Sequence, residues 1–291
     1  MNDDLDDAVA VFEGVRGRLF GIAYRMLGSA TEAEDLVQDA WIRWQGTDRS
    51  AVLDPPAFLA TTTTRLAINA LQSARVRRET YIGPWLPEPV DTSADPMLGA
   101  ERNEALGFAV LTMLERLTPT ERAAYVLHEA FAYSYAQIAE VVQLSEPACR
   151  QLVSRARKHL HGDRRREVAA SEQRRLLTAF VAAAQTGDLE QLERLFAEDV
   201  VSYSDGGGRV RASKFPVHGR VIVAKFHRAF HTHFWPGVEV RPSELNGQPS
   251  MLLSKDGTTF AALALVASDD GIDQVLWMMN PDKLGAVAAH A

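Results

Sequence analysis

The sequence predicts a chain of several domains, in which two all-α domains are followed by an α+β domain. Three observations predict this. Apolar residues recur at spacings of three and four through residues 10–80 and again from about residue 101, as in amphipathic helices. A proline-rich stretch without periodicity separates the two helical parts. After residue 167, two more helical patterns lead into a series of alternating or apolar runs, which is typical of a sheet.

The composition is that of a globular protein and excludes several other classes. The chain has 291 residues, of which 46% are hydrophobic. No apolar run approaches the roughly 18 residues that span a bilayer, so we expect no membrane segment. The start, MNDDLDDAVA, is acidic, whereas a secretory signal begins basic and continues apolar, so we expect a cytoplasmic protein. One cysteine, Cys149, allows neither an intramolecular disulfide nor a multi-cysteine metal site.

Charge is unevenly distributed along the chain. The net charge is -7, but residues 1–60 carry 5 Arg against 11 Asp or Glu, whereas residues 145–166 carry 7 Lys or Arg against 2 acidic residues. The acidic N-terminal segment and the basic segment over residues 145–166 predict two different partners.

The first helical part has an acidic helix and ends in a basic cluster. In the acidic helix, Thr31 followed by Glu34 predicts a capping box. Its apolar residues can cover a core and leave polar residues free on another side, namely Asp35, Gln38 and Asp39. The basic cluster closes the next helical pattern and comprises Arg65, Asn69, Arg75, Arg77 and Arg78. Two interpretations stay open for it, a contact with DNA or a helix C-terminus that favours cations.

The linker over residues 82–100 contains four prolines within "IGPWLPEPVDTSADP". Its apolar residues Trp85 and Leu86 favour a linker that lies against a domain over one that moves freely.

The stretch "YAQIAEVVQLSEPACRQLVSRARKHL" predicts a helix-turn-helix, with Ser145 as the cap of the second helix. Gln143 stands where such turns commonly have glycine. The second helix carries phosphate-binding charges and donors for base edges, on Arg150, Gln151, Ser154, Arg155, Arg157 and Lys158. The alternative is a solvated basic helix, but its place in a helix-turn-helix favours DNA binding.

With these motifs, residues 10–166 resemble a sigma-70 family factor of the extracytoplasmic-function type, which has only the domains called region 2 and region 4. The resemblance implies region 2, a helical bundle, over residues 1–81 and region 4 over 101–166. It also implies a transcription initiation factor that directs core RNA polymerase to the minus 10 and minus 35 elements of promoters. Such a factor needs no catalytic residue, metal or cofactor, because the polymerase performs the chemistry.

The resemblance also implies roles for the residues above. "TEAEDLVQDAWIRW" is similar to the segment that binds the clamp helices of the beta-prime subunit, which assigns Asp35, Gln38 and Asp39 to polymerase. "FLATTTTRLAINALQSARVRRE" is similar to the segment that reads the minus 10 element, and the helix-turn-helix to the part that reads the minus 35 element. The basic cluster and the second helix of the helix-turn-helix are thereby expected to bind promoter DNA.

Residues 167–291 resemble the SnoaL-like and ketosteroid isomerase group of cone-shaped α+β domains. The whole chain is similar to sigma factors with a fused SnoaL-like domain, in which "WLPEP", "DGGG" and "NPDKL" recur. The fused domain is thought to regulate such factors in cis. The expected regulatory contact comprises Trp85, Leu86, Pro87, Asp205, Gly206, Gly207, Gly208, Asn280, Pro281, Asp282 and Lys283.

The triple glycine in "YSDGGGRVRA" has three interpretations. A phosphate loop is disfavoured, because the chain continues into extended sequence without the following Lys and Ser or Thr. A hairpin turn needs only Asp205 and Gly206. Three glycines permit another surface to approach the backbone, which predicts a docking loop that touches the linker or region 2.

Two alternatives remain for the C-terminal domain. One is a ketosteroid-isomerase-type enzyme fused to a DNA-binding module. Its candidate acid-base groups are Asp199, Tyr203, Asp205, His218, His227, His231 and His233. The histidines have no obvious carboxylate partner in the sequence. The other alternative is a sensor that binds a small-molecule ligand in the C-terminal pocket and thereby shifts docking.

Overall fold

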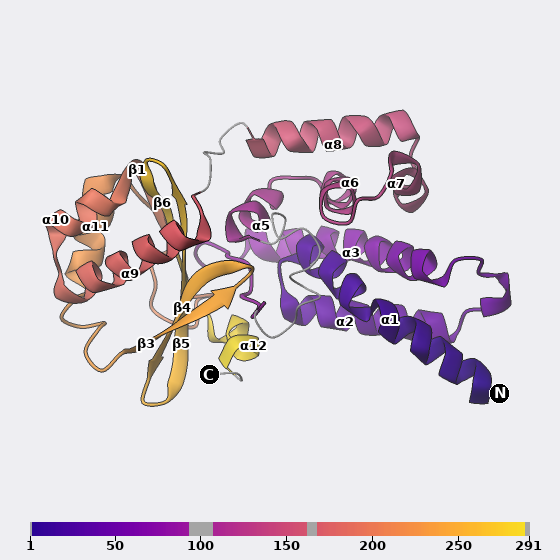
Figure 1. Ribbon diagram of the computed structural model, residues 1–291, viewed down its shortest axis with the longest axis horizontal. Coiled ribbons are helices and arrows are strands. Elements are labelled where there is room, and N and C mark those ends of the chain that lie inside the picture. Colours follow the sequence, from indigo (N-terminus) through magenta and orange to yellow (C-terminus); the bar gives the residue numbers. More distant parts are fainter. Residues whose placement is uncertain (1, 93–106, 162–167, 289–291) are drawn as a thin grey trace. The chain divides into compact units, whose positions relative to one another are not determined.

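The structure is a computed structural model and describes residues 2–92, 107–161 and 168–288 (Figure 1). The chain divides into two compact units. The first unit comprises Met1–Glu79 and Asp95–Asp163, and the second comprises Thr80–Ala94 and Arg164–Ala291. The start of the predicted linker is thus grouped with the C-terminal domain, and residues 93–100 of that linker lie outside the described residues.

Three helices form the first half of the first unit, namely α1 (Asn2–Leu27), α2 (Ala30–Gln45) and α3 (Pro55–Glu79), with a short 3-10 turn η1 (Arg49–Ala51) between the last two. They pack through apolar side chains, and the indole of the fully buried Trp44 donates to the carbonyl of Ala8 over 3.1 Å. Helix α2 begins earlier than predicted. Ser29, and not Thr31, is its N-cap and accepts from the amide of Glu32, so the predicted capping box of Thr31 and Glu34 is wrong.

Over the described residues 107–161 the same unit has four helices, namely α5 (Phe108–Leu114), α6 (Pro119–Glu129), α7 (Tyr135–Val142) and α8 (Glu146–His161). Helices α7 and α8 form the predicted helix-turn-helix. Gln143 adopts a left-handed conformation with φ of 57°, so it takes the backbone geometry that glycine commonly supplies in this turn. Ser145 caps α8, because its hydroxyl accepts from the amide of Ala148 over 3.4 Å.

The second unit is an α+β domain. Its elements are α9 (Ala170–Thr186), α10 (Leu189–Leu195), β1 (Phe196–Asp205), β2 (Val217–His218), α11 (Arg220–Ala229), β3 (Glu239–Leu245), β4 (Gln248–Lys255), β5 (Thr258–Ser268), β6 (Gly271–Met278), the 3-10 turn η3 (Pro281–Lys283) and α12 (Gly285–Ala288). The six strands form one sheet in the order β2-β1-β6-β5-β4-β3, in which β1 and β6 are parallel and the other neighbours antiparallel.

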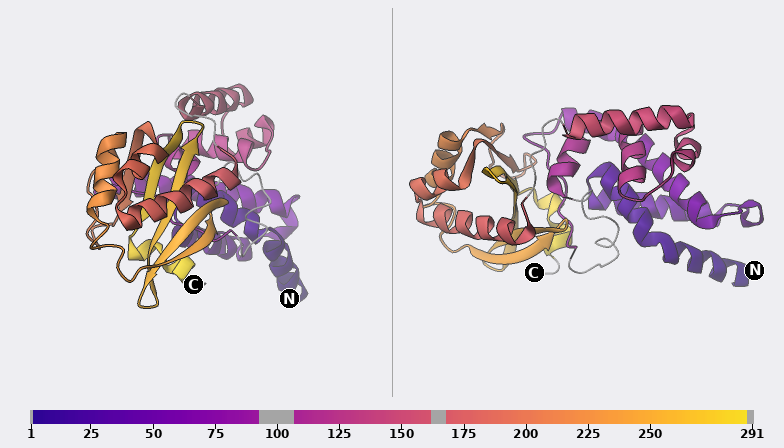
Figure 2. Two further views of the ribbon diagram at one scale, coloured as in Figure 1. Left: turned by 60° about the vertical axis from the view of Figure 1, so that its left-hand side comes forward. Right: turned by 45° about the horizontal axis from the view of Figure 1, so that its top comes forward.

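Helices α9, α10 and α11 lie on one face of this sheet (Figure 2), and their apolar residues share a core with inward-facing residues of the strands. The strand after α10 begins at Phe196, whereas the helical spacing of "LEQLERLFAED" predicts a helix over residues 189–199. Phe196 is buried in the core and pairs with Ile272 of β6, so sheet pairing prevails over local helical preference.

Within the described ranges, we find no helix whose length and hydropathy would suit a membrane span.

Candidate functional site

The residues predicted to bind polymerase lie on the outer side of α2. Asp35, Gln38 and Asp39 are exposed, while Leu36 and Val37 of the same helix are buried. The sequence periodicity places them this way, because residues three and four apart share one side of a helix. They form an open acidic surface, which suits a basic protein partner.

Arg65 and Asn69 are exposed one turn apart on α3. The guanidinium of Arg65 donates to the carbonyls of Val141 and Glu140 over 2.9 and 2.8 Å. These carbonyls belong to the last turn of α7, where backbone acceptors are unpaired and the helix dipole favours a cation. Arg65 therefore already has partners inside the first unit, which sequence reasoning did not anticipate. Arg75, Arg77 and Arg78 belong to α3, but their side chains lie outside the described part of the chain.

Helix α8 has two distinct sides. Its apolar side is buried, and all six residues predicted to bind DNA are exposed on the other, namely Arg150, Gln151, Ser154, Arg155, Arg157 and Lys158. Three of the arginines pair with acidic residues of the first unit: Arg150 with Glu146, Arg155 with Glu121 and Arg157 with Glu129, at 2.5, 3.5 and 2.7 Å. The side chains of these three arginines are 45–60% exposed, so their guanidinium groups remain accessible to phosphate.

A buried ionic cluster lies inside the second unit, where the linker segment, residues 80–92, contacts the end of β1. The carboxylate of Asp205 is fully buried and accepts from Lys283 Nζ at 2.7 Å, from the Tyr81 hydroxyl at 2.5 Å and from the amide of Leu86 at 2.9 Å. Lys283 also donates to the carbonyl of Leu86. We call Tyr81, Leu86, Asp205, Asn280 and Lys283 the docking cluster.

Aromatic rings complete the docking cluster. The ammonium of Lys283 lies 4.2 Å from the ring centre of Trp85 and 4.9 Å from that of Tyr81, which is cation–π geometry. Asn280 donates to the Tyr81 hydroxyl over 2.9 Å. Burial, and then the hydrogen bond to Asp205, raises the pKa of Tyr81 well above its usual value, so the hydroxyl stays protonated and continues to donate.

Two of the three glycines, Gly207 and Gly208, bring their backbone against the linker segment, whereas Gly206 lies against Val210 and Ala212. Gly207 and Gly208 have φ of 58° and 71° and are the central residues of the turn that follows β1. A Cβ on Gly207 would lie 2.3 Å from Asn280 Nδ2 and 3.0 Å from the Tyr81 hydroxyl, and one on Gly208 would lie 2.9 Å from Ile82. The central residues of the turn therefore lie two positions after the pair predicted from the sequence, Asp205 and Gly206. Asp205 is instead the last residue of β1, and its side chain lies in the docking cluster.

Other residues of the expected regulatory contact lie around the docking cluster. The sequence did not indicate all the residues that contact the linker segment. Pro87 is buried, whereas Pro281 and Asp282 are exposed and Asp282 pairs with Arg209 at 3.0 Å. Asn246 exchanges hydrogen bonds with the backbone of Val90, both 2.9 Å long. The Asn-Gly at 246–247 signals a hairpin turn, but no sequence signal gives the side chain a partner 156 residues away.

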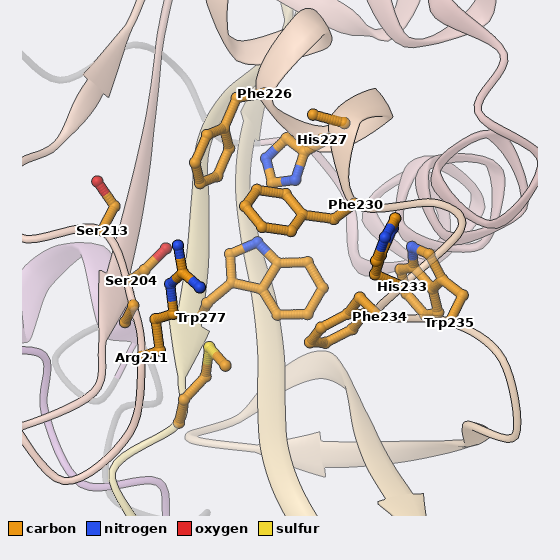
Figure 3. A pocket seen from close by; sticks show the side chains of 13 residues that line it. Ser204, Arg211, Ser213, Phe226, His227, Phe230, His233, Phe234, Trp235 and Trp277 are labelled. Carbon is orange, nitrogen blue, oxygen red and sulfur yellow. The ribbon is translucent and has the colours of Figure 1, made fainter.

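A cavity of about 560 Å³ opens inside the second unit between α11 and the sheet (Figure 3). Of the predicted acid-base groups, His227 and His233 line it, but Asp199, Tyr203, Asp205, His218 and His231 do not. Burial lowers the pKa of His227 to about 3, so its imidazole is neutral at physiological pH. The described lining residues include no carboxylate. The isomerase-type pairing of a histidine or tyrosine with a carboxylate therefore does not assemble here.

Among the described residues, His, Cys, Asp and Glu form no group of three or more that could hold a metal ion.

Comparisons with known proteins agree with this arrangement. Residues 11–77 match the sigma-70 region 2 family, and residues 107–160 match the family described as sigma-70, region 4. The chain is 37% identical over 294 residues to the ECF RNA polymerase sigma factor SigJ of Mycobacterium tuberculosis, covering 94% of this chain and 92% of the relative. It is 30% identical over 293 residues to SigI of the same species, a probable ECF RNA polymerase sigma factor, covering 98% and 97%.

A crystal structure of the Mycobacterium tuberculosis extracytoplasmic function sigma factor SigJ matches with a TM-score of 0.76 and 32% identity, over 96% of this chain and 98% of that one. The fold class expected from the sequence is confirmed as two all-α sigma domains followed by an α+β domain. The chain therefore belongs to the sigma-70 family, as a sigma factor of the extracytoplasmic-function group.

Proposed function

We propose that this chain is a transcription initiation factor that binds core RNA polymerase and directs it to specific promoters. The observation that carries the proposal is helix α8, which buries its apolar side and exposes all six residues predicted to contact DNA. Membership of the sigma family supports the same function and agrees with the expectation that the chain is not an enzyme. Such a factor works where polymerase and promoters are, in the cytoplasm.

Each surface has a proposed partner. The acidic surface of Asp35, Gln38 and Asp39 binds the clamp helices of the beta-prime subunit. Helix α8 enters the major groove at the minus 35 element, and α3, through Arg65, Asn69 and the arginines near its end, contacts the minus 10 element. The hydrogen bonds from Arg65 to α7 must break before its guanidinium can reach DNA.

Run-off transcription with core RNA polymerase tests this function. The double substitution Arg155→Ala and Arg157→Ala should lower promoter-specific output by at least about tenfold, because each arginine lost from the groove removes on the order of 1–3 kcal/mol of DNA binding. The matched control is Arg194→Ala, an exposed arginine of the second unit that also forms an ion pair. Equal output from the double variant and the control, or no initiation by the unsubstituted chain on a promoter library, would contradict the proposal.

We further propose that the C-terminal domain regulates the sigma domains in cis through the docking cluster. The linker segment connects region 2 to region 4 along the chain, yet its backbone forms buried hydrogen bonds with side chains of the C-terminal domain. A linker held in this way restricts the arrangements available to the two sigma domains. This supports a docking loop that contacts the linker.

Gly207→Ala tests the regulatory contact. The new methyl group would overlap Asn280 at a backbone conformation that disfavours alanine, so the turn must move and the linker segment should loosen. We expect faster chymotrypsin cleavage at Tyr81 or Trp85 and a changed transcription output. Gly219→Ala is the matched control, since Gly219 also has positive φ but no neighbour within 4 Å of an added Cβ. If the two variants behave alike in both assays, close backbone approach has no regulatory role.

The cavity under α11 supports one addition to this function. Its volume of about 560 Å³ lies within the roughly 300–1,000 Å³ of small-molecule sites. We propose that a small-molecule ligand binds there and adjusts the regulation.

A further inference from the structure

The cavity under α11 has an unusually aromatic lining. Phe226, Phe230, Phe234, Trp235 and Trp277 all contribute to its wall, and Figure 3 shows their rings around the open space. Aromatic walls favour flat, apolar ligands, because rings stack offset or edge to face and bury large areas. The main body of a matching ligand is therefore aromatic.

Two buried nitrogen atoms in this wall lack hydrogen-bond partners among the described residues. They are Nε1 of Trp277 and Nε2 of His227, and both residues are 5% exposed. Buried indole N–H groups usually find an acceptor, so an unpaired one is unusual. The imidazole is neutral and can donate or accept through its free nitrogen, depending on its tautomer. The wall thus offers at least one unused donor to an oxygen atom.

The rim of the cavity is cationic. Arg211 and Ser213 line it opposite the aromatic residues, as Figure 3 shows, and no carboxylate is among the described lining residues to balance the guanidinium. Arg211 is exposed, so it can bind an anionic group at the entrance without the cost of burying a lone charge. Arginine matches planar oxyanions such as carboxylates with two parallel hydrogen bonds.

From these observations we propose that the cavity binds an aromatic molecule that carries an anionic oxygen group, a carboxylate or sulfonate. The rings lie among the aromatic side chains, the anion pairs with Arg211, and Trp277 Nε1 donates to an oxygen of the ligand.

Such a ligand contacts residues just before and just after the turn that lies against the linker segment. Residues 204 and 205 are neighbours on β1 and point to opposite faces of the sheet, so Ser204 lines the cavity while Asp205 enters the docking cluster. The turn continues through the glycines to Arg211. The regulatory meaning of the ligand rests on the proposed function, whereas its binding does not.

Two fluorescent probes test the binding proposal on the purified full chain, without polymerase. They are 8-anilinonaphthalene-1-sulfonate, an aromatic anion, and N-phenyl-1-naphthylamine, the uncharged molecule with the same ring system. We expect the anionic probe to bind more tightly. Arg211→Gln should weaken the anionic probe about tenfold and the uncharged probe less than about twofold. The matched control is Arg228→Gln, an exposed arginine of α11 that does not line the cavity.

A blocking variant locates the probe. Ala229 is exposed and lines the cavity, so Ala229→Trp should fill the entrance and abolish binding of both probes while leaving the thermal unfolding midpoint unchanged. Binding that survives this substitution in a folded protein, or an equal loss of the two probes in Arg211→Gln, would overturn the proposal. A failure of transcription alone would contradict only the proposed function.

Discussion

Lys283→Met should destabilise the C-terminal domain by about 3 kcal/mol, because removing one partner of a buried ion pair leaves the other charge uncompensated. The remaining charge is Asp205, which is fully buried, and Lys283 itself is only 11% exposed in its side chain. The substitution also removes the cation from between the rings of Trp85 and Tyr81. We expect the thermal unfolding midpoint of this domain to fall by roughly 10 °C.

Scanning calorimetry of the full chain measures this effect, and a second substitution isolates its cause. Asp205→Asn removes the stranded charge and keeps one oxygen, which can accept from the amide of Leu86 while the new NH2 group donates to the Tyr81 hydroxyl, so the double variant with Lys283→Met should recover at least half of the loss. Lys225→Met, at an exposed lysine of α11, is the control and should change the midpoint little. If the double variant is less stable than Lys283→Met alone, charge burial is not the cause.

Arg122→Ala should destabilise the first unit by about 3 kcal/mol, through a cavity and the loss of two hydrogen bonds. The side chain of Arg122 is 2% exposed. Its guanidinium donates to the carbonyl of Arg25, in the last turn of α1, over 3.1 Å and pairs with Glu115 at 2.6 Å. The side chain of Arg122 therefore links α6, which belongs to region 4, to α1, which belongs to region 2.

Urea unfolding followed by helical circular dichroism measures the loss, and hydrogen exchange locates it. We expect amides of α6 to exchange faster in Arg122→Ala, because local opening follows local stability. Arg43→Ala, at an exposed arginine of α2, is the matched control and should stay within about 0.5 kcal/mol of the unsubstituted chain. Unchanged exchange in α6 would show that Arg122 does not hold the two helices together.

Local patterns were enough to predict much of the fold. The spacing of apolar residues predicted the helices of the first unit, and the alternating and apolar runs after residue 167 predicted the sheet. These features succeed because they depend on neighbours within about one turn or one strand. Local patterns do not predict an element correctly where pairing with a residue distant in the sequence decides its structure. Phe196 forms a strand because it pairs with Ile272. The start of α2 at Ala30 differs for a local reason, since the side chain of Ser29 caps the helix two residues before Thr31.

The sequence by itself determined the helix-turn-helix, the exposed basic side of α8 and the exposed acidic side of α2, because period and charge are local properties. Only the tertiary structure decided what the motifs around the linker do. Asp205 and Lys283 are 78 residues apart, and Tyr81 lies 124 residues from Asp205. Their hydrogen bonds exist because the fold of the sheet returns η3 to the end of β1, and the glycines let the linker segment approach both. The aromatic cavity likewise arises only when α11 covers the strands, since its rings come from separate elements that the sequence does not link.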